Sequence, residues 1–308
     1  MTGAWLVIPL LVGAYLVAVV EGWSSTGRVR PAAPLRAGLA LLGRESLVPR
    51  QPDRLLFATA PALLLVAAVL AAAVLPLAPG SIMADLATGA LFVNAALAYV
   101  LVAVVMAGWA PDGAYAMVAG WRFLGQLVAY SMLIVMPLTG VAMRAQSLVT
   151  TAVVTSQSVL WNVVAQPLGF VLFCLAALAV CFLPPFDLPT APGELAGGVM
   201  GEYTGDRLAV LRLARLVLVV TLATTITVFY LGGWLGFGLW LPSWAWASVK
   251  TLIVATLMLT VGRYVPRIRD AHLLSWSWKL GIPLALVNIF WVGITLLVAR
   301  YGVTMGAR

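Results

Sequence analysis

The chain has 308 residues, of which 63% are hydrophobic and 9% are charged, and its formal net charge is +8. This composition excludes a water-soluble globular fold, because several uncharged stretches exceed the roughly 20 residues that cross a bilayer. The alternation of a membrane barrel is absent, so helices are the expected spanning elements. The basic residues lie mainly in short loops, which is typical of membrane topology and not of nucleic-acid binding.

We predict an all-α, polytopic membrane helical bundle in which residues 1–308 form a single transmembrane domain. The first apolar stretch is interpreted as a retained span, because it has no basic leader and no small-residue cleavage site. No internal repeat is evident, which disfavours a free-standing transporter. The eight predicted transmembrane helices cover residues 2–20, 55–77, 86–108, 122–143, 160–182, 208–231, 244–262 and 280–299.

The basic residues predict the orientation of this bundle, because Lys and Arg concentrate in cytoplasmic loops. With the N-terminus outside, 14 of the 18 basic residues lie at the inner side, where the long loops 21–54, 183–207 and 263–279 also lie. The strong preference for Arg over Lys, with abundant Ala, is compatible with a GC-rich bacterial genome. We therefore predict a multi-pass protein of a bacterial plasma membrane. The four outer basic residues are Arg144, Lys250, Arg300 and Arg308.

The two cysteines and one histidine of the chain do not suggest a metal site. Cys174 and Cys181 are seven residues apart on one predicted helix, about 10 Å by helix rise, which is too far for a disulfide. His272 is the only histidine. The chain thus offers no ligand set of its own for zinc, haem or an iron–sulfur cluster.

The most informative segment is residues 185–205, PFDLPTAPGELAGGVMGEYTG. It holds Asp187, Glu194 and Glu202, three of only 10 acidic residues. Carboxylates beside spanning helices are costly and therefore mark candidate functional sites. The plainer alternatives are turn formation and capping for Asp187 and Glu194, and a solvated loop charge for Glu202.

Two further segments share a pattern with known proteins. Residues 108–126, GWAPDGAYAMVAGWRFLGQ, hold a Gly-Trp-Ala turn, a Tyr-Ala pair and an Arg-x-x-x-Gln. Residues 263–279, RYVPRIRDAHLLSWSWK, are basic and end in Trp-Lys. Together with residues 185–205, they resemble the NuoH family, a membrane subunit of bacterial respiratory complex I. The resemblance runs along the whole chain, more weakly at 41–57 and 231–234.

The resemblance implies the membrane subunit of a proton-translocating NADH-quinone oxidoreductase. Such a subunit forms the quinone tunnel, links the peripheral redox arm to the membrane arm and starts a chain of buried polar residues. It has no turnover alone and no covalent cofactor; iron–sulfur clusters and flavin belong to partner subunits. The implied partners are NuoB-like and NuoD-like peripheral subunits, NuoA-, NuoJ- and NuoK-like membrane subunits, quinone and lipid.

Two sets of candidate site residues follow from the resemblance. The predicted quinone-binding residues are Glu21, Arg36, Phe186, Asp187, Glu202 and Arg267. The predicted proton-relay residues are Tyr130, Glu194, Glu202 and Lys250. The plainer alternatives are an interfacial charge at Glu21, lipid-phosphate contacts for the arginines, and snorkelling of Lys250 to the outer interface.

The chain departs from the family where carboxylates are expected. Ser131 stands in place of a family Glu, and Arg215 stands in the place of the Glu in an Ala-Glu-Tyr triplet. Glu194 is the one Glu left of a run of three. About five such carboxylates are absent, which indicates a divergent member with a thinned relay.

Three alternatives remain. One is the membrane anchor of a membrane-bound hydrogenase or formate hydrogenlyase-type complex, which a neighbouring gene for a nickel-binding large subunit would favour. Another is a non-catalytic scaffold paralogue that keeps its docking loops. The loss of relay carboxylates favours this alternative. The last is a free-standing transporter, which purification without a peripheral arm would favour.

Overall fold

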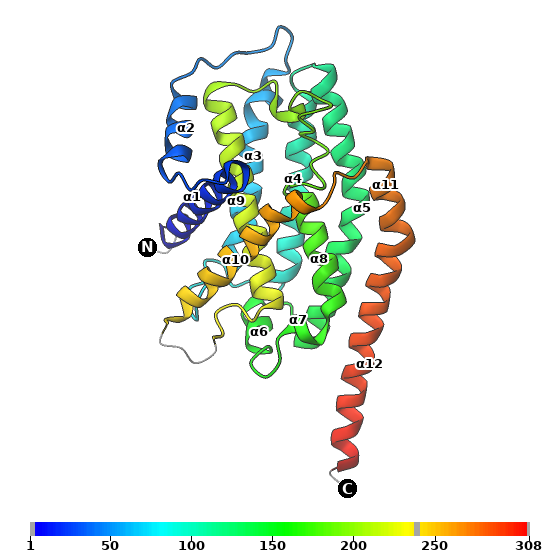
Figure 1. Cartoon of the computed structure of the whole chain (residues 1–308). Helices are drawn as coiled ribbons and strands as arrows, with labels where there is room; N and C mark the ends of the chain where they lie inside the picture. Colours follow the sequence, from blue (N-terminus) through cyan, green and yellow to red (C-terminus); the bar gives the residue numbers. More distant parts are fainter. Residues whose placement is uncertain (1–3, 237–240, 307–308) are drawn as a thin grey trace.

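The structure, a computed structural model, describes residues 4–236 and 241–306. Within these residues the chain is all-helical without a strand, which confirms the predicted fold class. Long helices stand side by side around α9, as Figure 1 shows. The helices are α1 (Ala4–Thr26), α2 (Ala32–Leu42), α3 (Arg54–Ala73), α4 (Gly89–Trp109), α5 (Ala114–Ala145), α6 (Thr150–Thr155), α7 (Asn162–Ala165), α8 (Pro167–Val180), α9 (Gly205–Tyr230), α10 (Ser243–Tyr264), α11 (Asp270–Trp276) and α12 (Ile282–Gly306).

Seven helices in the described part of the chain are long and apolar enough to cross a membrane. The stretch predicted as the fifth span, 160–182, is instead broken into α7 and α8. Gln166 leaves helical geometry at φ −142° and ψ 65°, and Pro167 then starts α8 because proline lacks an N–H and suits a first helical position. The 14 residues of α8 rise about 21 Å, less than the roughly 30 Å hydrocarbon core.

Small residues let the central helices approach closely. α3 buries a row of alanines that includes Ala60, Ala67 and Ala71, and α9 is the most buried candidate span. α4 and α5 meet at Gly108, where a Cβ atom would lie 2.7 Å from the carbonyl oxygen of Ala116. Such small-residue contacts are typical of helix packing inside membranes, where apolar burial alone gives little attraction.

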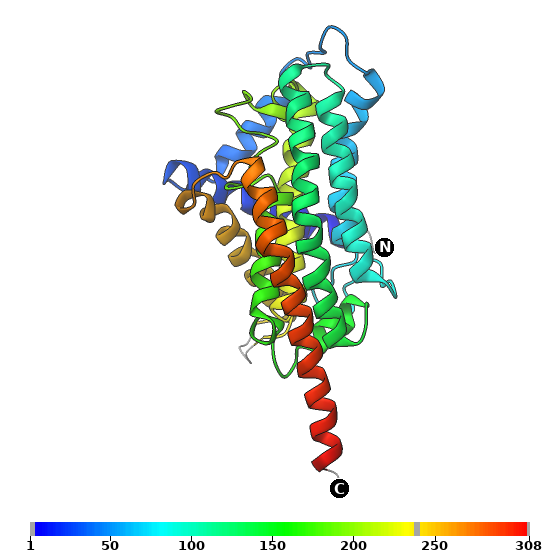
Figure 2. The same cartoon turned by 90° about the vertical axis from the view of Figure 1, so that its right-hand side faces the viewer.

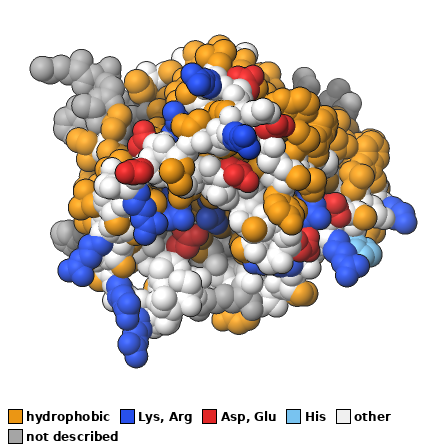
Figure 3. All heavy atoms as spheres, turned by 90° about the horizontal axis from the view of Figure 1, so that it is seen from above, with side chains coloured by type: hydrophobic (Ala, Val, Ile, Leu, Met, Phe, Trp, Pro, Cys, Tyr) orange, Lys and Arg blue, Asp and Glu red, His pale blue; other side chains and the backbone are white. Residues whose placement is uncertain are grey.

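The loops at one end of the bundle carry many charged residues of both signs. The loops 43–53, 110–113 and 183–204 meet at the upper end in Figure 1, which we call the charged end. Figure 3 looks onto this end and shows side chains of both charges scattered over it. At this end Asp53 starts α3, since its Oδ1 accepts hydrogen bonds from the N–H groups of Leu55 and Leu56. That this end faces the cytoplasm, with the N-terminus outside, stays a prediction.

Some helices depart from the upright arrangement. α1 (dark blue) is strongly tilted away from the direction of the upright helices and crosses them, as Figure 2 shows. α12 continues past the opposite end of the bundle in both views. It follows α11 through a π-helical turn, Ser277–Gly281, that packs against α5.

Candidate functional site

Three of the carboxylates that the sequence singled out form ion pairs with arginines. Each pair joins two different parts of the fold, because the partners come from separate helices or loops. The pairs are Arg122 Nη1–Glu194 Oε2 at 2.7 Å, Arg267 Nη2–Asp187 Oδ2 at 3.0 Å and Arg215 Nη1–Glu21 Oε1 at 3.3 Å. Asp187 is buried, whereas Glu194 is exposed.

The segment 183–204 is a compact loop held by its own backbone. The N–H of Ala191 bonds to the carbonyl of Asp187, and the N–H of Leu195 bonds to that of Ala191. The chain then turns through Gly198, whose φ of +53° favours glycine. A Cβ atom on Gly198 would lie 2.1 Å from the carbonyl oxygen of Pro189, so no larger residue fits. This rigid turn presents Asp187 inward and Glu194 outward.

The three segments that carried the family resemblance meet at this loop. Residues 263–279 contact it twice, through the ion pair with Asp187 and through a hydrogen bond from the N–H of Ile268 to the carbonyl of Pro185 at 3.2 Å. From α5, Arg122 pairs with Glu194, and Gln126 Nε2 donates to the carbonyl of Phe186 at 3.0 Å. Segments far apart in sequence thus form one site.

Below the loop, polar groups continue into the bundle. The Tyr130 hydroxyl and Gln126 Oε1 are buried and have no hydrogen-bond partner in the structure. Tyr130 lines a cavity of about 10 Å³ together with Phe186 and Trp276, which is at the lower limit of the space that one water needs. Buried polar atoms normally find a partner, so a water at this position would satisfy Tyr130.

Glu202 lies beside an aromatic stack. Its neighbour Tyr203 stacks on Phe57 with ring centroids 4.4 Å apart, and its hydroxyl donates to the carbonyl of Ala107. The Arg207 guanidinium lies 4.9 Å from the Phe57 ring centroid. Burial raises the pKa of the Tyr203 hydroxyl, which keeps it a neutral donor. Glu202 itself is exposed, and its carboxylate lies next to Gly113.

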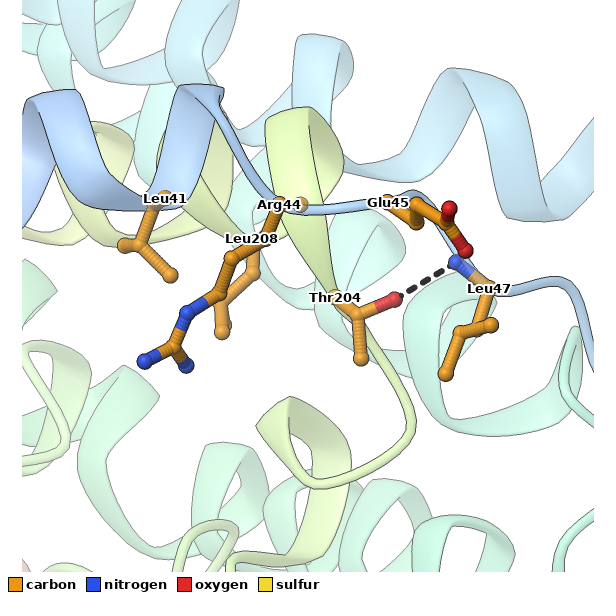
Figure 4. A pocket seen from close by; sticks show the side chains of 7 residues that line it. Leu41, Arg44, Glu45, Leu47, Thr204 and Leu208 are labelled. Carbon is orange, nitrogen blue, oxygen red and sulfur yellow. Dashed lines mark hydrogen bonds between the residues drawn. The ribbon is translucent and has the colours of Figure 1, made fainter.

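A cavity of about 330 Å³ opens between the loop after α2 and the start of α9, shown in Figure 4. The hydroxyl of Thr204 accepts a hydrogen bond of 2.7 Å from the N–H of Leu47, which ties its two walls together. None of the residues predicted for quinone binding lines it, and Arg36 is exposed on α2. The only sequence signal was the long basic loop 21–54. The lining residues are Leu41, Arg44, Glu45, Leu47, Thr204, Gly205 and Leu208.

The structure separates Lys250 from the other relay candidates. Glu194 and Glu202 lie in the loop 183–204 at the charged end, and Tyr130 lies on α5, two turns after Arg122. Lys250 lies on α10 at the opposite end, where its ammonium bonds to the loop that follows α9. No cluster of three metal-ligating side chains occurs among the described residues.

Comparison with known proteins identifies the family. The model of the NADH dehydrogenase family matches residues 21–293. The chain belongs to this family. One relative, the H subunit of the NADH-quinone oxidoreductase of Geobacillus kaustophilus, is 36% identical over 82% of this chain and 76% of its own length. An H subunit of the same enzyme from Geobacter metallireducens is 35% identical over 93% of this chain and 92% of its own length.

These NADH dehydrogenase family relatives come from bacteria and are named as subunits of a larger oxidoreductase. Seven helices of spanning length accompany the match in the described residues. The chain is therefore a multi-pass plasma-membrane protein of the NADH dehydrogenase family.

Proposed function

We propose that the chain is the membrane subunit of a complex I-like quinone oxidoreductase that forms the quinone tunnel and joins the peripheral arm to the membrane arm. The observation that supports this most is the convergence of residues 108–126, 185–205 and 263–279 at one end of the bundle. Three arginine–carboxylate pairs hold helices and loops together there or just below. A rigid, charged surface at one end of an apolar bundle suits the binding of a water-soluble redox subunit.

A quinone combines a long apolar tail with a polar head group, so its site must connect lipid to a polar end. The cavity between Leu41, Arg44 and Leu208 has this character, with apolar walls and a guanidinium at its rim. Its size lies within the usual range for small-molecule sites. We propose that it forms part of the quinone path, alongside the quinone-binding set Glu21, Arg36, Phe186, Asp187, Glu202 and Arg267.

The mixed charges of the charged end suit protein partners. Glu194 and Glu202 of the loop 183–204 are exposed, as is Arg267, which pairs with Asp187 of the same loop, and complementary charges steer and orient such contacts. NuoB-like and NuoD-like subunits would dock on this face, and NuoA-, NuoJ- and NuoK-like subunits would pack against the lipid-facing helices. In this proposal the redox centres belong to the partners.

We propose that proton coupling begins at Glu194, Glu202 and Tyr130. Glu194 is bonded to Arg122, one turn of α5 before Gln126 and two turns before Tyr130. The unpartnered atoms of Gln126 and Tyr130 would bind water that extends the path into the bundle. Because Arg215 pairs with Glu21 where the family resemblance expects a carboxylate, this relay depends on fewer titratable groups.

Affinity purification of the tagged chain from its native membrane, with an assay of inhibitor-sensitive quinone reduction, tests the proposal. NuoB-like and NuoD-like partners together with activity are expected. A nickel-containing partner would instead support the hydrogenase anchor, and partners without activity would support a scaffold. Purification of the chain alone would contradict the whole proposal.

A further inference from the structure

The ammonium group of Lys250 donates all three of its hydrogens to backbone carbonyls. We call this group of carbonyls, together with the ring of Trp161, the seat of Lys250. Its Nζ donates to the carbonyl oxygens of Leu231 at 2.7 Å, Gly233 at 3.2 Å and Leu235 at 2.5 Å. The ammonium also lies 4.3 Å from the ring centroid of Trp161, within the range of a cation–π contact. A neutral amine has only two hydrogens, so it would leave one of these carbonyls without a donor. The seat therefore fits the ammonium and not the amine.

The same end of the bundle holds a second cation, Arg144, at the end of α5. Its guanidinium donates to Asn162 Oδ1 at 2.5 Å and to the carbonyl of Leu160 at 2.9 Å. Asn162 in turn donates to the carbonyl of Phe229, in the last turn of α9. Two positive charges therefore surround the C-terminus of α9, where the helix dipole favours cations.

These cations have no carboxylate partner among the described residues. All ten acidic side chains are described, and the three ion pairs found there involve Arg122, Arg215 and Arg267. The loops 74–88, 146–161 and 231–236 lie at this end and contain one acidic residue, Asp85, which is exposed. The positive charge of Lys250 is therefore bonded to dipoles but not neutralised.

Buried hydroxyls accompany this charge. Thr227 of α9 is fully buried, and the Oγ1 of Thr251, the residue after Lys250, lies 3.4 Å from Thr227 Oγ1 while its hydrogen goes to the carbonyl of Ala247 at 2.8 Å. Thr221 and Thr225, nearer the middle of α9, are fully buried too and donate to the carbonyls of Ala68 and Thr221. The oxygens of these hydroxyls can still accept hydrogen bonds from water, as can the buried Tyr230 hydroxyl, which has no partner.

We propose that Lys250 is a fixed positive charge that closes this end of the bundle to protons and other cations. A positive charge in a narrow, poorly hydrated region raises the energy of any cation beside it. The role goes beyond the proposed quinone and relay functions and assigns Lys250 to blocking a proton path rather than carrying it. The protein would thereby keep a hydroxyl-lined bundle from leaking the gradient that its membrane maintains.

The test is passive proton permeability in vesicles of the native membrane that hold the assembled complex, without electron donor or quinone. A potassium diffusion potential drives the leak, and a pH-sensitive dye reports it. Lys250→Gln, which keeps amide donors but removes the charge, should raise the chain-dependent leak roughly tenfold or more. Lys250→Met should raise the proton leak as well, whereas Lys250→Arg keeps the charge and should leave the leak at the wild-type rate.

Controls separate this charge effect from a packing defect. Val249→Met changes the exposed neighbour of Lys250 and should leave the vesicles tight. Trp161→Leu weakens the seat but keeps the charge, so it should also stay tight; a leak there would overturn the proposal. Assembled Lys250→Gln vesicles as tight as wild type would overturn it too. Because no turnover is measured, either result is independent of the quinone reaction.

Discussion

Arg267 Nη2 lies 3.0 Å from Asp187 Oδ2, which joins two inter-helix segments that are 80 residues apart in sequence. The Asp187 side chain is 9% exposed and the Arg267 side chain 54%. A pair with one exposed partner contributes little to overall stability, because solvent screens it. Its main effect is to fix the position of the loop 183–204 relative to the segment before α11.

Asp187→Asn should therefore lower activity more than stability. We expect the purified complex to lose quinone reductase activity or its peripheral subunits, while the melting temperature falls by a few degrees at most. The matched control is Asp270→Asn, at an exposed carboxylate in the same region that forms none of the three ion pairs. Equal activity in both variants would show that the Asp187 pair does not position the site.

Gly198→Ala should disrupt the loop directly. The added Cβ would lie 2.1 Å from the Pro189 carbonyl at a φ of +53°, and we expect a cost of about 2–4 kcal/mol. Limited proteolysis of the loop in detergent is the measurement. Gly125→Ala is the control, because its Cβ would meet no atom within 4 Å and alanine favours a helix. Equal cleavage rates in the two variants would contradict the predicted strain.

Arg215→Glu places a carboxylate where Glu21 already lies. The present pair is 3.3 Å long and both side chains are partly exposed, so two carboxylates there should repel and loosen the contact between α1 and α9. We expect a lower melting temperature that Glu21→Gln restores in the double variant. A double variant no more stable than Arg215→Glu alone would show that the two residues are not coupled.

Leu208→Trp should fill the cavity at the start of α9. Since the larger ring occupies space between Leu41 and Arg44, we expect a several-fold higher KM for quinone with little change in folding. Leu39→Trp adds the same ring on the exposed side of α2 and should leave KM unchanged. An unaltered KM in Leu208→Trp would remove this cavity from the quinone path.

Sequence reasoning predicted the fold class and the placement of the loops 183–207 and 263–279 on the same side of the bundle, because long apolar runs and charge placement are local signals. It did not predict that residues 108–126 meet them. It did not predict the break at Gln166, since the apolar stretch 160–182 reads as continuous and only packing reveals where it bends. The arginine partners of Glu21, Asp187 and Glu194 were also missed, because pairing across 70 or more residues leaves no spacing pattern.

The cavity near Leu208 and the seat of Lys250 depend on tertiary placement in the same way. Sequence composition indicated a basic loop and a lone lysine, but it gave no sign of which carbonyls Lys250 would meet. Those carbonyls belong to a turn with positive φ at Gly232 and Gly233, whose course is set by packing against Trp161 and Val154.

The shortness of α8 also has a consequence for biogenesis. A segment of 14 apolar residues is too short to partition into lipid on its own as a stable span. It packs against α5, α9 and α12, with Asn288 of α12 accepting a hydrogen bond from the N–H of Gly169 at 3.1 Å. α8 would therefore settle only after its later neighbours leave the ribosome, so truncation before α12 should leave the middle of the bundle unfinished and open to membrane proteases.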